Sequence, residues 1–92
     1  MRTEQTAIQD LQAGKISGPA AEATITGVNG QLARAVEAAG RNSILGIALT
    51  QLVSENGTMA EALNQSVPVA NLGEVIGSIN QDVSNVEANC HG

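Results

Sequence analysis

The last quarter of the chain carries apolar residues at an alternating spacing of three and four. These positions are Val69, Leu72, Ile76, Ile79, Val83, Val86 and Cys90. Because an α-helix turns once every 3.6 residues, this spacing places all seven on one narrow face, the pattern of a coiled-coil seam. The residues between them include weak helix formers such as Gly77 and Ser84. We therefore predict a final helix over about Val69–Asn89 that needs a partner along this assembly seam.

The pattern alone leaves that partner open. The seam can pack against another subunit. It can equally fold back on a helix of the same chain between Ile25 and Ala39, as in a helical hairpin.

The absence of Phe, Tyr and Trp restricts what the interior can contain. The core must be built from Ile, Leu and Val, which make up about a quarter of the 92 residues, and from Ala. Small side chains of this kind require helices to approach one another closely. A domain of this size is marginally stable alone, and a single Cys excludes an internal disulfide. Oligomerisation is the expected source of additional stability.

The most apolar run lies in the middle of the chain, from Ile44 to Val53. Its large residues point to nearly every side of a helix: Ile44, Leu45, Ile47, Leu49, Leu52 and Val53. A helix that is apolar all round is normally covered on every side. Few elements of so small a chain could provide that cover, so we predict a second apolar contact with a neighbouring subunit. At about ten residues the run is too short to cross a bilayer.

Two helices are predicted before this run. Residues 1–13 form a short helix with Ile8 and Leu11 on its apolar side, ended by Gly14. A linker follows from Lys15 to Ala20, where Gly18-Pro19 breaks any helix and Pro can open the next one. Residues 20–39 keep helical spacing, either as one helix or as one that restarts near Gly30, because Asn-Gly is a strong turn signal.

A third break is predicted at Ser54–Gly57. The sequence from Thr58 to Glu61 then matches the capping box Thr-x-x-Glu, in which each side chain satisfies a free backbone N–H of the other residue. We predict Thr58 as the N-cap of a short helix that ends near Ser66.

These elements predict an all-α fold, a small helical hairpin or bundle with a C-terminal heptad-patterned helix that packs between subunits. Residues 1–19 are expected to form an N-terminal arm with a Gly-Pro linker, and residues 20–92 a helical assembly domain.

Charge is distributed unevenly within a net value of −5, since residues 42–92 hold five carboxylates and no Lys or Arg. This acidic, aromatic-free composition argues against nucleic acid and anionic membranes as partners. The single Cys90 and His91 are neighbours near the end, without the ligands of a zinc site or the third group of a catalytic triad. We predict no enzyme activity, cofactor or metal. The N-terminal stretch lacks an apolar signal core, which favours a cytoplasmic protein.

The function predicted is that of a structural subunit whose helices pack copies of the chain into a homo-oligomer, filament or particle. Two alternatives come from other classes. One is a ribosomal peptide precursor whose modified core ends in Asn89-Cys90-His91-Gly92. The other is an acidic adaptor that binds a different helical or basic protein.

The stretch KISGPAAEATITGVNGQLARAVEAAGRNS contains a Pro-Ala followed by a helix of small residues. In this it resembles subunits of bacterial R-bodies, the killing-trait family of small helical proteins rich in Ala, Gln and Asn. The resemblance implies a subunit that polymerises into coiled ribbons.

Overall fold

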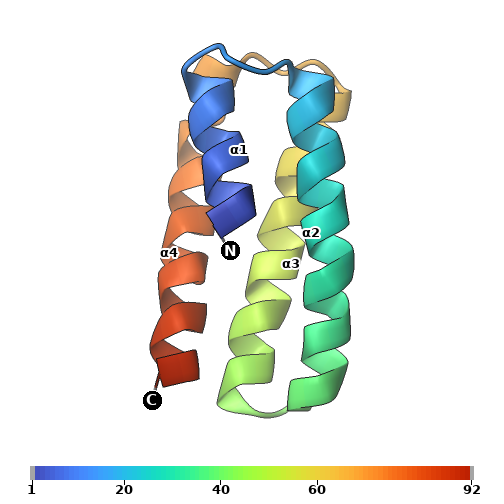
Figure 1. Cartoon of the computed structure of the whole chain (residues 1–92), viewed down its shortest axis with the longest axis vertical. Coiled ribbons are helices and arrows are strands. Elements are labelled where there is room, and N and C mark those ends of the chain that lie inside the picture. Colours follow the sequence, from blue (N-terminus) through green and yellow to red (C-terminus); the bar gives the residue numbers. More distant parts are fainter. Residues whose placement is uncertain (1, 92) are drawn as a thin grey trace.

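The computed structural model describes the backbone of residues 2–91, and their side chains except at positions 2, 4, 90 and 91. This part of the chain is helical and contains no strand, which confirms the predicted all-α class. The elements are α1 (Arg2–Gln12), α2 (Gly18–Ala39), α3 (Ile44–Asn64), the short 3-10 helix η1 (Val69–Asn71) and α4 (Gly73–His91). Figure 1 shows the longer helices running up and down along the molecule, which measures 36 × 19 × 19 Å.

Helix α1 follows the sequence prediction closely. Ala7, Ile8 and Leu11 are buried, as expected for residues three and four apart on one face. Gly14 ends the helix with a φ of +76°, and the N–H of Lys15 donates to the carbonyl of Asp10 at 2.8 Å. This is the hydrogen bond of a Schellman motif, which favours glycine at the left-handed position. Ile8 and Leu11 belong to the same core as the other helices, so α1 is an integral part of the bundle.

Helix α2 starts at Gly18, so the Gly-Pro pair that was predicted as a linker lies in the first turn of this helix. The hydroxyl of Ser17 accepts from the N–H of Ala20 at 3.3 Å, and Pro19 lies in the first turn, where its missing N–H costs nothing. The helix then continues without interruption through Gly30 to Ala39. The restart near Gly30, one of the two predicted outcomes, does not occur.

Helix α3 is also continuous, and here the sequence prediction is wrong. Ser54–Gly57 does not end a helix, and Thr58 and Glu61 lie inside α3 rather than at an N-terminus. The Thr58 hydroxyl donates back to the carbonyl of Ser54 at 3.2 Å, a bond made within a helix. The actual N-cap is Ser43, whose hydroxyl accepts from the N–H of Gly46 at 2.9 Å.

Both helices are continuous because the two predicted breaks, near Gly30 and at Ser54–Gly57, contact each other across α2 and α3. Asn56 is fully buried, and its Nδ2 donates to Oδ1 of Asn29 at 3.2 Å. Nδ2 of Asn29 in turn donates to the carbonyl of Val53 at 3.1 Å. The two turn-forming segments therefore hold each other in helical form across the α2–α3 contact. Buried apolar side chains on either side, Leu52 and Met59, stabilise the helix through Gly57.

The hairpin between α2 and α3 depends on a close approach. Gly40 adopts a φ of +90°, and a Cβ atom placed on Gly46 would lie 1.9 Å from the carbonyl oxygen of Gly40. Only glycine fits at position 46.

Helix α4 packs antiparallel to α3 (Figure 1) and starts later than predicted. Val69 lies in η1, so the final helix begins at Gly73 and not at Val69. Ser66 adopts a left-handed φ of +63° after α3, and the N–H of Val67 donates to the carbonyl of Ala62 at 3.0 Å. A serine thus occupies a helix-ending position that normally favours glycine.

Candidate interaction surface

The seam of the final helix is used inside the chain. Leu72, Ile76, Ile79, Val83 and Val86 are all buried, with exposed fractions from 0 to 5%. They belong to one core with residues of the other three α-helices, and the main helix that packs against α4 is α3. The hairpin alternative was therefore right about an intramolecular partner and wrong about its identity, since it expected the Ile25–Ala39 helix.

The two ends of the seam differ from its middle. Val69 is half-buried on η1. The side chain of Cys90 lies outside the described residues, so its predicted place on the seam stays a prediction.

The middle run predicted as a second apolar contact divides in two. Leu49 and Leu52 are buried in the core, and Leu45 and Val53 are half-buried beside it. Ile44 and Ile47, by contrast, are 74% and 52% exposed. Only one side of a helix can face the core. Leu45, Leu49 and Leu52, which are three and four residues apart, lie on that side, so the other apolar residues of the segment face outward.

These two isoleucines are the large hydrophobic side chains left exposed in the described part of the chain. They lie one turn apart at the start of α3, next to the tight hairpin held by Gly46. Single exposed hydrophobic residues are common on protein surfaces. Two on adjacent turns, while the other large aliphatic side chains of the described residues are buried or half-buried, make this the main exposed apolar surface of the described part of the chain.

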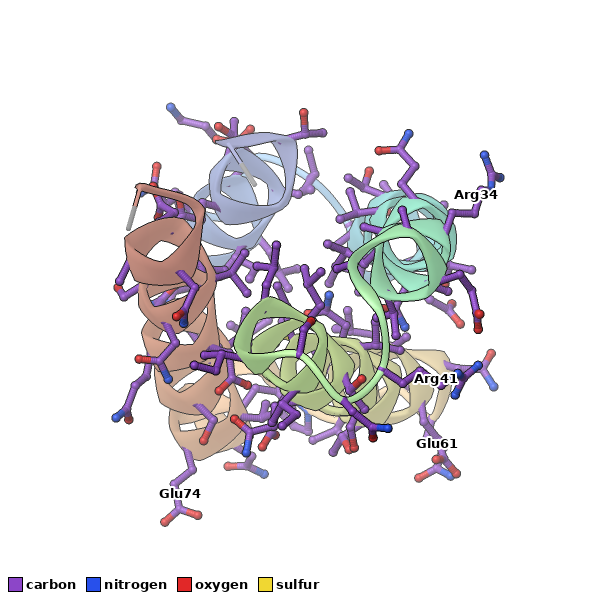
Figure 2. All side chains as sticks on the ribbon, turned by 90° about the horizontal axis from the view of Figure 1, so that it is seen from below. Arg34, Arg41, Glu61 and Glu74 are labelled. Atoms are coloured by element: carbon purple, nitrogen blue, oxygen red, sulfur yellow. The ribbon has the colours of Figure 1, made fainter. Side chains whose placement is uncertain are left out.

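An apolar groove of about 170 Å³ lies along the α2–α3 contact. It is lined by Ala33 and Val36 of α2, by Thr50 and Val53 of α3, and by Arg41 of the hairpin. Arg41 is exposed and forms an ion pair with Glu37 on the surface. In the view along the long axis, Arg34 and Arg41 lie on the same side of the molecule (Figure 2).

The other side of α3 faces a polar groove of about 330 Å³ shared with α4. Glu55 lines it from α3, and Asp82 and Asn85 from α4. The Oδ2 atom of Asp82 is buried and makes no hydrogen bond with the described residues, and burial raises the pKa of this carboxyl above its ordinary value of 3.8. The heptad pattern carries no signal for this groove, because its residues fall beside the seam.

The described residues contain no group of three or more His, Cys, Asp or Glu side chains able to hold a metal ion. Nor does this part of the chain contain a helix that is long and apolar enough to cross a membrane. The side chains of Cys90 and His91 lie outside it.

Comparison with known proteins found no matching family model, no similar curated protein and no similar solved structure. The likeness of Lys15–Ser43 to R-body subunits thus rests on the residues of that stretch alone.

Proposed function

We propose that this chain is a non-enzymatic structural subunit that associates with copies of itself by helix packing. The observation that carries the proposal is the exposure of Ile44 and Ile47 at the start of α3. Burial of apolar area is the main favourable term in protein association, and these side chains offer it without any rearrangement of the core. The contact surface proposed here replaces the α4 seam, because the seam residues are already buried within one chain.

The composition of the neighbouring surface supports close packing of helices. Exposed positions further along α3 include Thr50, Ser54 and Gly57. Short side chains allow two helix backbones to approach one another closely. A cytoplasmic location remains a prediction from the sequence.

The test is the molar mass of the intact chain by size-exclusion chromatography with light scattering, over a range of concentrations. Detection must be by refractive index, since no Trp or Tyr is present. We expect a mass above the 9.3 kDa of one chain, rising with concentration. A constant mass of one chain would refute self-association and favour an adaptor that waits for a different protein.

A double variant, Ile44→Asp with Ile47→Asp, locates the contact. Both side chains are exposed, so we expect the fold to remain and the mass to fall to that of one chain. The matched control is Ala23→Asp on the exposed surface of α2, which adds a carboxylate elsewhere. An unchanged mass in the double variant would place the contact on another face.

A further inference from the structure

The outward side of α3 has a heptad-like spacing of its own. Ile47, Thr50, Ser54, Gly57 and Glu61 alternate by three and four residues, and all five are exposed. We call this row the α3 ridge. Its spacing places the five on one stripe of the helix, opposite the stripe that faces the core. Apart from its two ends the ridge consists of short, uncharged side chains.

The ridge carries a projection at one end and an open position toward the other. Ile47 is 52% exposed, whereas a Cβ atom placed on Gly57 would meet nothing within 4 Å. The two residues are ten positions apart, which is about 15 Å along a helix. A projection and an open position on the same stripe are what an isologous interface requires, since each subunit then offers both halves of the contact.

One antiparallel register satisfies the whole ridge. With a two-fold axis at the level of residue 52, Ile47 lies opposite the partner's Gly57, and Thr50 lies opposite the partner's Ser54. In each pair, a residue that begins a three-residue step of the row (Ile47 or Ser54) faces one that ends such a step (Gly57 or Thr50). Antiparallel knobs-into-holes packing pairs residues in this way. The hydroxyl of Thr50 already donates to the carbonyl of Gly46 at 2.8 Å, so its donor needs no partner in the interface.

Charge selects the antiparallel orientation. Arg41, which is exposed and ion-paired with Glu37 on the surface, precedes the start of α3, and Glu61 lies near its end, so the two charges occupy opposite ends of this helix. Seen along the long axis, both lie on the same side of the molecule (Figure 2). An antiparallel copy brings Arg41 toward the partner's Glu61 at each end, whereas a parallel copy brings like charges together.

We propose that a second copy of this chain docks antiparallel on the α3 ridge, with Ile47 of each subunit seated over the partner's Gly57. This inference rests on the self-association proposed above and specifies its geometry. The charged rim formed by Arg41 and Glu61 sets the orientation, and Ile44 covers apolar surface beside the ridge.

Disulfide trapping tests the geometry. In a Cys90→Ser background, one preparation carries Ile47→Cys, a second carries Gly57→Cys, and a third is an equal mixture of the two. In the antiparallel register, positions 47 and 57 face each other, while the two copies of position 47 are about 15 Å apart. A disulfide requires Cα atoms within roughly 7 Å, so we expect covalent dimer in the mixture and not in either single preparation.

The outcomes separate the two proposals. A covalent dimer in the unmixed Ile47→Cys preparation means that the two copies of position 47 face each other in a parallel contact, which overturns the inference. An absence of dimer in all three, with a wild-type mass above that of one chain, also overturns the inference but leaves self-association intact. A wild-type mass of one chain at concentrations up to about 1 mM overturns both.

A second experiment fills the open position. Gly57→Leu adds a side chain whose Cβ atom meets nothing within 4 Å in the single chain, so the fold is expected to remain while the site for Ile47 is blocked. The matched control, Gly30→Leu on α2, adds the same side chain at another exposed glycine with open space. We expect the first variant to have the mass of one chain and the control to keep the wild-type mass. Equal masses for wild type and Gly57→Leu would overturn the inference.

Discussion

The inner side of α4 and the outer side of α3 each carry a row of residues with three-and-four spacing. The row on α4 is buried, whereas the row on α3 is exposed. On α4 the row contains five large aliphatic residues with exposed fractions of 5% or less. On α3 the outward row contains one, Ile47, followed by Thr50, Ser54 and Gly57. The apolar area of the first row is stabilised by burial within the chain, at roughly 1.5–3 kcal/mol for each Val, Leu or Ile side chain. The second row has too little apolar area to enter the core and stays exposed.

Spacing predicts a helix face, while the amount of apolar area on that face decides whether it is buried within the chain. The spacing of the α4 seam is also compatible with a contact between subunits. The seam is buried within the chain because α3 is covalently connected to α4 and offers an inward face of its own with Leu49, Leu52 and Met59.

The largest expected effect separates the two rows directly. Ile79 is fully buried at the centre of the seam, so Ile79→Asp places a carboxylate in the core. We expect a loss of about 4 kcal/mol or more in the free energy of unfolding, enough to abolish the helical circular-dichroism signal. Ile47→Asp on the α3 ridge is the control, and it should retain the fold. Equal unfolding of both variants would mean that the two rows are equivalent.

The two sides of α3 can be compared by adding one methyl group to each. Gly46→Ala places its Cβ against the backbone of Gly40, so we expect a loss of about 1–3 kcal/mol and a distorted hairpin. Gly57→Ala meets open space inside a helix and should gain about 0.5–1 kcal/mol. Urea unfolding followed by circular dichroism measures both. A stabilised Gly46→Ala variant would contradict the close approach in the hairpin.

The inward row of α3 includes one buried polar residue, Asn56, and its removal tests how the helices stay continuous. Asn56→Ala deletes the donor to Asn29 and leaves a cavity, which should cost about 1–3 kcal/mol. Hydrogen exchange is expected to increase around Gly30 and Gly57, where the sequence favours turns. Asn85→Ala, at an exposed position of α4, should change the stability by less than about 0.5 kcal/mol. Unchanged exchange in Asn56→Ala would show that apolar packing alone keeps both helices intact.

The smallest effect concerns Asp82, at the edge between the α4 seam and the polar groove. Desolvation raises the pKa of its carboxyl in the folded chain above the ordinary value of 3.8. The folded state therefore holds this proton at higher pH than the unfolded state, and the carboxyl contributes stability that is lost as pH rises through the raised pKa. We expect Asp82→Asn to have a higher free energy of unfolding than wild type at neutral pH. This difference should shrink as the pH falls and the carboxyl of wild type becomes protonated. A difference between the two proteins that does not vary with pH would contradict the assignment.

Much of the fold follows from local signals that the structure confirms. Gly14 ends the first helix and Pro19 opens the second, because a left-handed residue and a fixed φ act within one turn. The exposed pair Ile44 and Ile47 also lies within the run whose apolar character suggested an external contact, although the α4 seam was the stronger candidate for that role.

The two helix breaks suggested by the sequence in α2 and α3 are absent for one shared reason. The Asn29-Gly30 turn signal and the Thr58–Glu61 capping box are both valid as local signals. They are overridden because Asn29 and Asn56 meet across the α2–α3 contact and because the core holds Leu52 and Met59 in one helix. Local propensities amount to about 1 kcal/mol per residue or less, while packing of several aliphatic side chains contributes more.

Spacing and backbone sterics within a few residues were enough to predict the helical class, the buried face of α4 and the end of α1 at Gly14. The tertiary structure alone decided that α2 and α3 are continuous, that the α4 seam packs on α3, and that Ile47 and Gly57 lie on an outward ridge. Those outcomes depend on which helix faces contact each other, and the local spacing of apolar residues does not specify contacts between residues that are distant in the sequence.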